Sequence, residues 1–380
     1  MNSSYDAIVI GAGGMGSASL WHLARRGLKV LGLERFQVGH VRGSSHGETR
    51  IIRKAYFEHP DYVPLLRRAY DLWAELEQNC GEKLFEPVGI LQVGQPDSAL
   101  IAGVHRSAKI HRLPVESIFH HEVPARFPGF IADPNMDALF EKNAGFLHVE
   151  ACVRAHARLA VRHGAEIREN IVVQSYARSL DQIIVSTDQG TLTSSALVLC
   201  AGPWSSTFLP HSLSLRRKVV LWFETSDDSY NMDRGCPTFC FETPDGFYYG
   251  FPSLNGREVK VAEHSGGRVF DDADKIDRQV TPADEVRIRA FVAKYLPKLT
   301  NQVTRRSTCM YTMTPDEHFI LDGQFDRPRV VWAAGFSGHG FKFAPIIGSV
   351  MADFVMHGET QEPAGFLSGR RFGGHGCEEE

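Results

Sequence analysis

Two groups of residues in this chain have the types and spacing that chemistry at a cofactor requires. Cys309 stands within Thr308–Thr312, and the glycine-rich sequence Gly11-Ala12-Gly13-Gly14-Met15-Gly16 lies nearly three hundred residues earlier. Such glycines can bind the pyrophosphate of a dinucleotide, and a cysteine thiolate is a reactive nucleophile. Together they indicate a tethered flavin, although a single cysteine in a strand-like segment is more often a small buried hydrophobic residue.

The segments around the glycines follow the order that a dinucleotide site requires. Residues 6–10 have the apolar character of a buried parallel strand, and residues 17–26 have helical spacing. Gly11 permits a tight turn, Gly13 lets the backbone approach a pyrophosphate, and Gly16 lets the helix pack closely on the strand. We therefore expect free amides at the start of the helix to face an anion.

A second strand, predicted at residues 29–33, ends at Glu34. A carboxylate at this point suits the two hydroxyls of a ribose and would repel a 2′-phosphate. FAD or NAD is therefore favoured over NADP, and the glycines alone leave the choice between flavin and nicotinamide open.

The next segment, residues 43–53, is small and polar and contains two arginines three residues apart, Arg50 and Arg53. If a helix begins near Glu48, both arginines fall on one face. One could then contact a flavin ring while the other binds a substrate carboxylate through its planar guanidinium. An ordinary pair of surface arginines is the alternative.

Alternation in the predicted strand 258–264 places Lys260 and His264 on one face and Val259 and Val261 on the other. An inward Lys260 would be available for redox chemistry, whereas a half-exposed strand with a solvated polar face is the simpler alternative. By the same argument Cys309 shares a face with Tyr311. Only one of the adjacent residues Tyr248 and Tyr249 can point into a cavity.

The wider pattern predicts an α/β protein whose nucleotide domain is interrupted by a sheet-rich substrate domain. Helices are predicted at residues 62–78, 149–162, 282–295 and 346–357. Strands are predicted within residues 85–93, 166–186, 196–201, 219–224, 246–252, 258–264 and 330–334. The strand at 196–201 breaks at Gly202, where the backbone can approach a cofactor.

Composition excludes several classes of function. The chain has 380 residues, 43% of them hydrophobic and 23% charged, and a net charge of -4, so it has no basic footprint for nucleic acid. Seven cysteines without a CxxC pair indicate a reducing compartment. No metal cluster, secretory signal or membrane span is predicted, and we expect a cytoplasmic protein.

With these residues laid out, the chain resembles the monomeric sarcosine oxidase and N-methyltryptophan oxidase family of covalent flavoproteins. The stretches that carry the resemblance are residues 11–34, 45–50, 248–252, Lys260 with His264, 309–312, 315–319 and 335–343. The resemblance implies a Rossmann-like FAD-binding domain (residues 1–85, 147–214 and 305–370) and an antiparallel-sheet substrate domain of the D-amino acid oxidase type (residues 86–146 and 215–304). Residues 371–380 are expected to form a flexible tail.

The resemblance also implies the reaction. A secondary amino acid, N-methyl or cyclic, would be oxidised to an imine that then hydrolyses, and O2 would be reduced to H2O2. The FAD would be joined through its 8α-methyl group to the sulfur of Cys309, and the protein would act as a monomer. Another amine substrate, such as pipecolate, glycine or a glycated amino acid, is the alternative within enzymes, and a non-catalytic dinucleotide-binding protein is the alternative outside them.

The matching positions receive roles from the family. Arg53 and Lys342 would hold the substrate carboxylate, with Tyr249 and Cys240 also lining the pocket. The catalytic group would be Lys260, Arg50, His264, Tyr249 and Tyr311, with Lys260 activating oxygen. The cofactor would be bound by Gly11, Gly13, Gly14, Met15, Gly16, Glu34, Arg35, Ser44, Ser45, His46, Thr49, Arg50, Val173, Gly202, Trp204, Cys309, Gly338, His339, Gly340 and Lys342.

Four positions depart from the family pattern. Ser45 and Glu48 stand where the family loop has the first of two histidines and an aspartate, so the contact made by that histidine is absent. Cys240 lies near the position of a pocket-lining methionine of sarcosine oxidases, and Glu263 replaces a bulkier neutral residue beside His264. The smaller Cys240 predicts a substrate larger than sarcosine.

Overall fold

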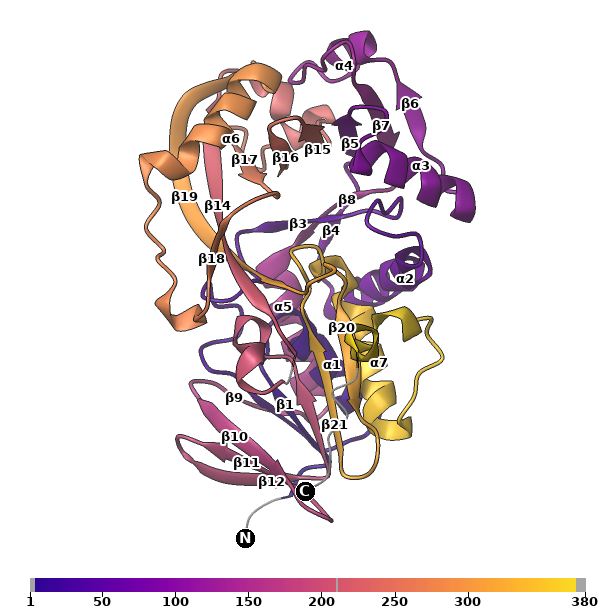
Figure 1. Ribbon diagram of the computed structural model, residues 1–380, viewed down its shortest axis with the longest axis vertical. Coiled ribbons are helices and arrows are strands. Elements are labelled where there is room, and N and C mark those ends of the chain that lie inside the picture. Colours follow the sequence, from indigo (N-terminus) through magenta and orange to yellow (C-terminus); the bar gives the residue numbers. More distant parts are fainter. Residues whose placement is uncertain (1–3, 210, 374–380) are drawn as a thin grey trace.

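The computed structural model describes residues 4–209 and 211–373, which form a parallel-sheet layer with helices and a second, larger sheet beyond it (Figure 1). The first layer is a six-stranded sheet with the order β20-β21-β13-β1-β2-β9. Its strands are β1 (Ala7–Ile10), β2 (Val30–Leu33), β9 (Glu166–Arg168), β13 (Ala196–Leu199), β20 (Ile320–Gln324) and β21 (Arg329–Ala334). All of its pairs are parallel except β20 with β21.

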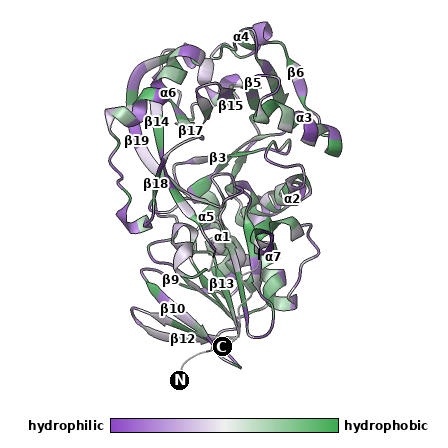
Figure 2. Cartoon of the chain, in the orientation of Figure 1, coloured by the Kyte–Doolittle hydropathy of each residue, from purple (hydrophilic) through white to green (hydrophobic). Residues whose placement is uncertain are grey.

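Helices cover this sheet because its central strands are apolar on both faces. They are α1 (Gly14–Ala24), α2 (Tyr62–Cys80), α5 (Val149–Arg162) and α7 (Ala344–His357). α1 and α7 are buried almost all round, and Gly348 lets them approach closely, since a Cβ there would lie 2.5 Å from the Ala18 carbonyl carbon. In Figure 2, α7 and the strands beside it are accordingly largely green, the colour of hydrophobic residues.

The second layer is a nine-stranded sheet with the order β18-β14-β17-β16-β15-β5-β7-β6, and β19 pairs with β14. Its strands are β5 (Ile90–Gly94), β6 (Glu116–Ile118), β7 (Asp137–Glu141), β14 (Ser214–Thr225), β15 (Thr238–Thr243), β16 (Gly246–Gly250), β17 (Glu258–Glu263), β18 (Arg268–Phe270) and β19 (Leu299–Met313). The remaining helices are α3 (Ala99–His111), α4 (Val123–Arg126) and α6 (Pro282–Tyr295). β14 and β19 are long and run from this sheet toward the first layer (Figure 1).

Two small sheets complete the fold. One has the order β10-β11-β12 and the other β3-β8-β4. Their strands are β3 (Thr49–Ile52), β4 (Phe85–Glu86), β8 (Gly145–His148), β10 (Val173–Arg178), β11 (Ile183–Thr187) and β12 (Gly190–Ser194). No helix in the described part of the chain is long and apolar enough to cross a membrane.

The structure corrects three expectations. Residues 49–52 form strand β3 rather than a helix, because they pair with β8 in antiparallel register. The large sheet is mixed rather than purely antiparallel, since β5 and β15 are parallel. Arg371 and Phe372, expected in a flexible tail, lie in the short helix η8 (Gly369–Phe372), where Arg371 pairs with Asp316 at 2.7 Å. The rest of that predicted tail, residues 374–380, lies outside the described residues.

Candidate active site

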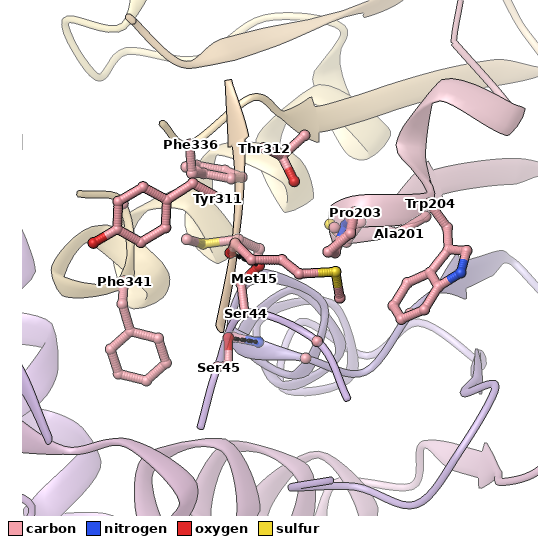
Figure 3. A pocket seen from close by; sticks show the side chains of 18 of the residues that line it. Met15, Ser44, Ser45, Ala201, Pro203, Trp204, Tyr311, Thr312, Phe336 and Phe341 are labelled. Atoms are coloured by element: carbon pink, nitrogen blue, oxygen red, sulfur yellow. Dashed lines mark hydrogen bonds between the residues drawn. The ribbon is translucent and has the colours of Figure 1, made fainter. Parts of the chain in front are cut away.

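A cavity of about 920 Å³ lies between the two large sheets and is lined by both. It receives the carboxyl ends of β1 and β13, the first residues of α1, and side chains from β15, β16 and β19. Ligands of open α/β sheets bind at the carboxyl ends of the strands. In Figure 3, Met15, Ser44 and Ser45 lie near Tyr311 and Phe336, with Pro203 and Trp204 at the other side of the view.

Most of the side chains predicted from the sequence share this cavity. Its lining includes Gly11, Gly13, Gly14, Met15, Glu34, Arg35, Ser44, Ser45, Arg50, Arg53, Val173, Gly202, Trp204, Cys240, Tyr249, His264, Tyr311, Gly338, His339, Gly340 and Lys342. Gly16, His46, Thr49, Lys260 and Cys309 were also predicted, but they stand behind the lining rather than in it.

The glycine turn has the geometry of a cradle for an anion. Gly11 has φ 88°, and a Cβ on Gly16 would lie 1.8 Å from the Gly11 carbonyl oxygen, so neither position accepts a side chain. A Cβ on Gly13 would meet nothing within 4 Å, so the space above this residue is open. The Gly14 amide donates to Ser45 Oγ at 3.3 Å, which joins the loop after β2 to the start of α1.

Glu34 closes the second strand and its carboxylate is buried beside the cradle. It accepts hydrogen bonds from the Ala12 amide at 2.7 Å and the Phe36 amide at 2.9 Å, and His40 Nε2 lies 3.3 Å away. Burial raises the pKa of Glu34, but His40 and the two amides outweigh burial, so the pKa lies below its ordinary value. The group is therefore an anion, as the pairing with a ribose diol requires.

Asp274, which lines the cavity, makes contacts that were not predicted from the sequence. Asp274, in the short helix η5 (Ala273–Lys275), accepts a hydrogen bond from Trp204 Nε1 at 3.0 Å and pairs with Arg35 Nη2 at 2.9 Å. The Arg35 guanidinium also lies 5.3 Å from the centre of the Trp204 ring. Nothing in the local pattern around Asp274 signals this contact, because it joins segments 239 residues apart.

At the opposite end, the cavity is lined by cations and neutral hydrogen-bonding rings. Arg53 is 4% exposed, and its Nη2 lies 2.8 Å from Glu58 Oε2. Burial raises the pKa of Glu58, but Arg53 outweighs it and lowers that pKa to about 2. Arg53 Nε is buried and has no hydrogen-bond partner among the described residues. Glu58 was missed from the sequence because the turn that brings it back to Arg53 follows no recognisable motif.

Lys342 is the second cation at this end, in the short helix η6 (Phe341–Phe343). Its Nζ donates to the His339 carbonyl at 2.6 Å. Burial, with Arg53 nearby, lowers the pKa of Lys342 to about 7. Arg53 and Lys342 are thus both buried in the same wall.

Three rings line the same end of the cavity. His264 Nδ1 lies 3.3 Å from the Tyr311 hydroxyl, and the centre of the Tyr249 ring lies 6.3 Å from that of His264. Burial lowers the pKa of His264 to about 3 and raises the pKa values of Tyr249 and Tyr311. All three groups are therefore neutral near pH 7. Tyr248 points the other way and stacks on Phe291, with ring centres 4.3 Å apart.

A family model described as FAD dependent oxidoreductase matches residues 6–354. The chain belongs to the FAD-dependent oxidoreductases. Among the described residues, no cluster of three histidine, cysteine, aspartate or glutamate side chains is placed to hold a metal ion.

Curated relatives within this family resemble the chain over almost its full length. Monomeric sarcosine oxidase from Bacillus sp. (strain B-0618) is 39% identical over 376 residues, which are 97% of this chain and 96% of that protein. N-methyl-L-tryptophan oxidase from Yersinia pestis (strain Pestoides F) is 36% identical, covering 92% of this chain and 95% of that protein.

Solved structures share the fold of this FAD-dependent oxidoreductase. The Tyr258Phe mutant of NikD, described as an unusual amino acid oxidase, superimposes with a TM-score of 0.87 at 24% identity, covering 96% of this chain and 97% of that one. Glycine oxidase from Geobacillus kaustophilus superimposes with a TM-score of 0.80 at 19% identity, covering 97% and 98%. The α/β fold expected from the sequence, of the D-amino acid oxidase type, is confirmed.

The residues of the cavity fit FAD. The cradle, the Glu34 carboxylate and the open space over Gly13 suit its pyrophosphate and ribose, and the cavity volume of about 920 Å³ accommodates a ligand of this size. At the position of the predicted tether, Cys309 is 4% exposed on β19. Its Sγ lies 3.6 Å from Arg50 Nη2 and 3.7 Å from the Ser44 carbonyl oxygen. Arg50 and Ser44 line the cavity, so the thiol stands directly behind its wall.

Lys260 also stands behind the wall, held by the loop after β2. Its Nζ donates to the Gly47 carbonyl, and to the carbonyl and Oγ1 of Thr49, each at 3.1 Å. Three oxygen acceptors match the three hydrogens of an ammonium group. Burial and then Arg50 lower the pKa of Lys260 well below its ordinary value. Next to this loop, His46 Nε2 is buried without a hydrogen-bond partner in the described chain, and burial lowers the His46 pKa to about 3.

Proposed function

We propose that this protein is an FAD-dependent oxidase of secondary amino acids, N-methyl or cyclic, with the FAD covalently attached to Cys309. Bound FAD would accept a hydride from the carbon next to the amine nitrogen, which also loses its N–H proton so that an imine forms, and the two electrons and two protons would pass to O2, giving H2O2. The imine product would then be hydrolysed to an amine and a carbonyl compound. The names of the relatives, sarcosine oxidase and N-methyl-L-tryptophan oxidase, support N-methyl amino acids as the substrate class. The sarcosine oxidase is named as monomeric, which supports a single-chain enzyme.

One observation carries the proposal: a single cavity is lined both by the dinucleotide cradle and by the buried cations Arg53 and Lys342. Arg53 can present a planar pair of donors to a carboxylate, and Lys342 a point charge. Because Arg53 and Lys342 are each only 4% exposed, both contacts are stronger than they would be in solution.

The charges at this end also favour the substrate amine in its neutral form. Arg50 and Arg53 are positive, Lys342 with its pKa of about 7 is positive below that pH, Glu58 is paired with Arg53, and the rings of His264, Tyr249 and Tyr311 are neutral. An ammonium group would be repelled there, whereas a neutral amine can hydrogen-bond to His264 or to a phenol. An amine is oxidised to an imine only when its nitrogen is unprotonated, because the nitrogen lone pair forms the C=N bond. These residues would therefore hold the substrate in the reactive state.

Arg50 and Lys260 would act on the oxygen half of the reaction. Arg50 is a buried cation, and Lys260 is a buried amino group whose oxygen acceptors suit its protonated form, although burial lowers its pKa. Backbone carbonyls fix both, those of Ser44 and Thr49 for Arg50 and those of Gly47 and Thr49 for Lys260. Preorganised positive charge stabilises negative charge as it develops, without reorganisation during the step. Lys260 is our choice for oxygen activation.

Two measurements test the proposal. Acid precipitation should leave yellow flavin in the protein pellet. A peroxide-coupled assay should then show turnover with N-methyl and cyclic amino acids, with pipecolate, glycine and a glycated amino acid as comparison substrates, and poor turnover with N-methylbenzylamine, which lacks the carboxylate. A colourless protein that binds NAD and produces no peroxide would instead indicate a non-catalytic dinucleotide-binding protein.

A further inference from the structure

A cross-strand row of side chains extends from the substrate end of the cavity into the large sheet. Pairing across β17, β16, β15, β5 and β7 places in one line, each opposite the next, Ala262, Tyr249, Cys240, Gln92 and Leu139. Residues that pair directly across strands point to the same face of a sheet. Tyr249 and Cys240 line the cavity, and Gln92 is the next position in the row.

The neighbours of Gln92 along β5 show on which face of the sheet its side chain lies. The flanking residues Leu91 and Val93 pack in the core between this sheet and α6. Ile90, two residues before Gln92, packs with Cys240, Leu139 and the α3 residues Leu100, Ile101 and Val104. Gln92 therefore lies on the face of the sheet that carries Cys240 and packs against α3, one strand away from the cavity lining.

Gln92 is fully buried, with 0% exposure, and neither its Nε2 nor its Oε1 has a hydrogen-bond partner among the described residues. A carboxamide carries two donor hydrogens and an acceptor oxygen. A buried polar group without a partner is costly and calls for an explanation. The described residues supply no partner for this amide, so its partner is either a buried water or a molecule that enters the site.

The approach to the amide passes Cys240. Neighbouring strands are about 4.8 Å apart, so Gln92 lies one strand beyond a residue that already lines the cavity. Phe57 and Phe247 line the cavity and pack against the same group of residues as Cys240. A side chain extending from a substrate held at Arg53 and Lys342 would meet these apolar rings first, then the small thiol, and then the amide.

We propose that Gln92 is the polar end of a subsite for the substrate side chain, reached past Cys240, and that it selects amino acids whose side chain ends in a neutral hydrogen-bonding group such as a carboxamide. A charged side chain is disfavoured because a neutral amide does not balance a buried charge. A purely apolar side chain leaves the amide without a partner. The inference rests on the proposed function, since it assumes an amino acid substrate.

The test compares N-methyl-L-asparagine with N-methyl-L-leucine, whose side chains have the same branched shape, in wild type and in Gln92→Met. The wild-type enzyme should favour the asparagine derivative in kcat/KM. Gln92→Met, which keeps the length of the side chain and removes the amide, should reduce that preference at least about tenfold, because one buried hydrogen bond to the substrate is lost. The change should lie in KM more than in kcat, since binding precedes the redox step.

Thr238→Val is the matched control. Thr238 lies two residues before Cys240 on the same face of β15, but its hydroxyl already donates to the Gly89 carbonyl at 2.8 Å and it does not line the cavity. Thr238→Val should lower the melting temperature and leave the substrate preference unchanged. Gln92→Met should raise the melting temperature of the substrate-free enzyme, because an unpaired buried amide is replaced by an apolar side chain.

The outcomes separate the two proposals. No flavin reduction by any N-methyl amino acid would refute the proposed function. Flavin reduction with equal kcat/KM for the two derivatives, or a preference that Gln92→Met leaves intact, would overturn the subsite and leave the oxidase reaction standing. If Gln92→Met does not fold, Cys240→Met gives the same test, since a longer side chain at Cys240 should block the passage and abolish the preference.

Discussion

Arg53 and Glu58 form a buried ion pair in the wall of the cavity, with Nη2 of Arg53 2.9 Å from one carboxylate oxygen of Glu58 and 2.8 Å from the other. A substrate carboxylate that binds Arg53 must therefore share this cation with Glu58. The Glu58 carboxylate thus lies beside the position we assign to the substrate carboxylate. The affinity for substrate therefore depends on how strongly Glu58 competes for Arg53.

A double-mutant cycle on this pair should show strong coupling. Arg53→Ala leaves Glu58 as an unpaired buried anion and should destabilise the protein by roughly 3–5 kcal/mol. Adding Glu58→Gln should restore much of that loss, because the anion is removed. Urea unfolding of the two single variants and the double variant measures the coupling; additive losses would show that the pair is not energetically linked.

Binding should respond to Glu58 in the opposite sense from stability. Glu58→Gln frees Arg53 from its internal partner, so a simple carboxylate such as acetate should bind more tightly, by about tenfold. Arg53→Ala should weaken acetate binding by a comparable factor or more. The dissociation constants are measured by perturbation of the flavin spectrum, and weaker acetate binding in Glu58→Gln would contradict the shared-cation interpretation.

Cys309→Ser should abolish covalent attachment of the flavin, because the thioether requires the sulfur. Free FAD should still bind through the cradle between Gly11 and Glu34, so loss of the tether is separable from loss of binding. Cys200→Ala is the control, since Cys200 also lines the cavity but lies beside the cradle. Peptide mapping that places the flavin on any other cysteine would refute the assignment.

Lys260→Met should slow reoxidation of the reduced flavin by O2 by about two to three orders of magnitude, the usual cost of losing one preorganised donor or charge. Reduction of the flavin by substrate should change far less, because Lys260 stands behind the wall of the cavity rather than in its lining. Stopped-flow traces of the two half-reactions distinguish these effects. Equal slowing of both would argue for a structural role of the contacts that Lys260 makes with Gly47 and Thr49.

Much of the site was predictable because its elements have strong local signals. The order strand, glycines, helix, strand and acid predicted β1, α1 and β2, which bring Gly11 and Glu34 to one cavity. The alternation in β17 predicted the opposite facing of Lys260 and Val261, and Val261 packs in the core with α6 while Lys260 Nζ bonds to Gly47 and Thr49. The same period predicted that only one of Tyr248 and Tyr249 faces a cavity, and of the two only Tyr249 lines it.

The remaining features depend on contacts between distant segments. The role of Glu58 follows from the turn after β3, which brings it to Arg53. The role of Asp274 follows from its hydrogen bond with Trp204, and that of Gln92 from the register between β5 and β15. The short segment from Glu48 carries no pattern that distinguishes a helix from a strand, and its pairing with β8 decides in favour of the strand. The position of Cys309 behind the cavity lining also has no sequence signal, because alternation gives the face of a residue but not its depth.

The stability of the protein should fall in acid because of buried neutral histidines. Burial lowers the pKa of His156 to about 3, below its ordinary value of 6.5. The unfolded chain therefore binds a proton that the folded chain excludes, so this contribution is fully present above pH 6.5 and is lost as the pH falls toward 3. The loss for one such histidine is up to about 1.4 kcal/mol per pH unit.

His156→Gln should make the decrease in unfolding free energy between pH 6.5 and 4 shallower by about one proton, measured by urea unfolding at a series of pH values. His163→Gln, at an exposed position just after α5, is the control and should leave the slope unchanged. An unchanged slope in His156→Gln would show that other groups cause the loss of unfolding free energy in acid. His22 is a second contributor of the same sign, because burial and His156 also lower its pKa.

The last prediction concerns the pH dependence of anion binding and rests on Lys342. Burial and Arg53 lower the pKa of Lys342 to about 7, so the free enzyme holds it as a cation below that pH and increasingly as a neutral amine above it. A carboxylate binds the cationic form, so the affinity for acetate should be constant below pH 7 and fall by up to about tenfold per pH unit above it. The decrease should level off at higher pH, because a bound anion raises the pKa of Lys342 in the complex.

Acetate is the right probe for this pH dependence because it has no amine. The substrate becomes more reactive as its own amine loses a proton, and this gain would hide the loss of affinity above pH 7. Lys342→Met should bind acetate more weakly than wild type at pH 6 and show no decrease between pH 7 and 9, while Arg53→Lys should weaken binding but keep the pH dependence. If wild-type affinity stayed constant to pH 9, Lys342 would be either charged throughout or remote from the carboxylate, and the two-cation site for the substrate would reduce to Arg53 alone.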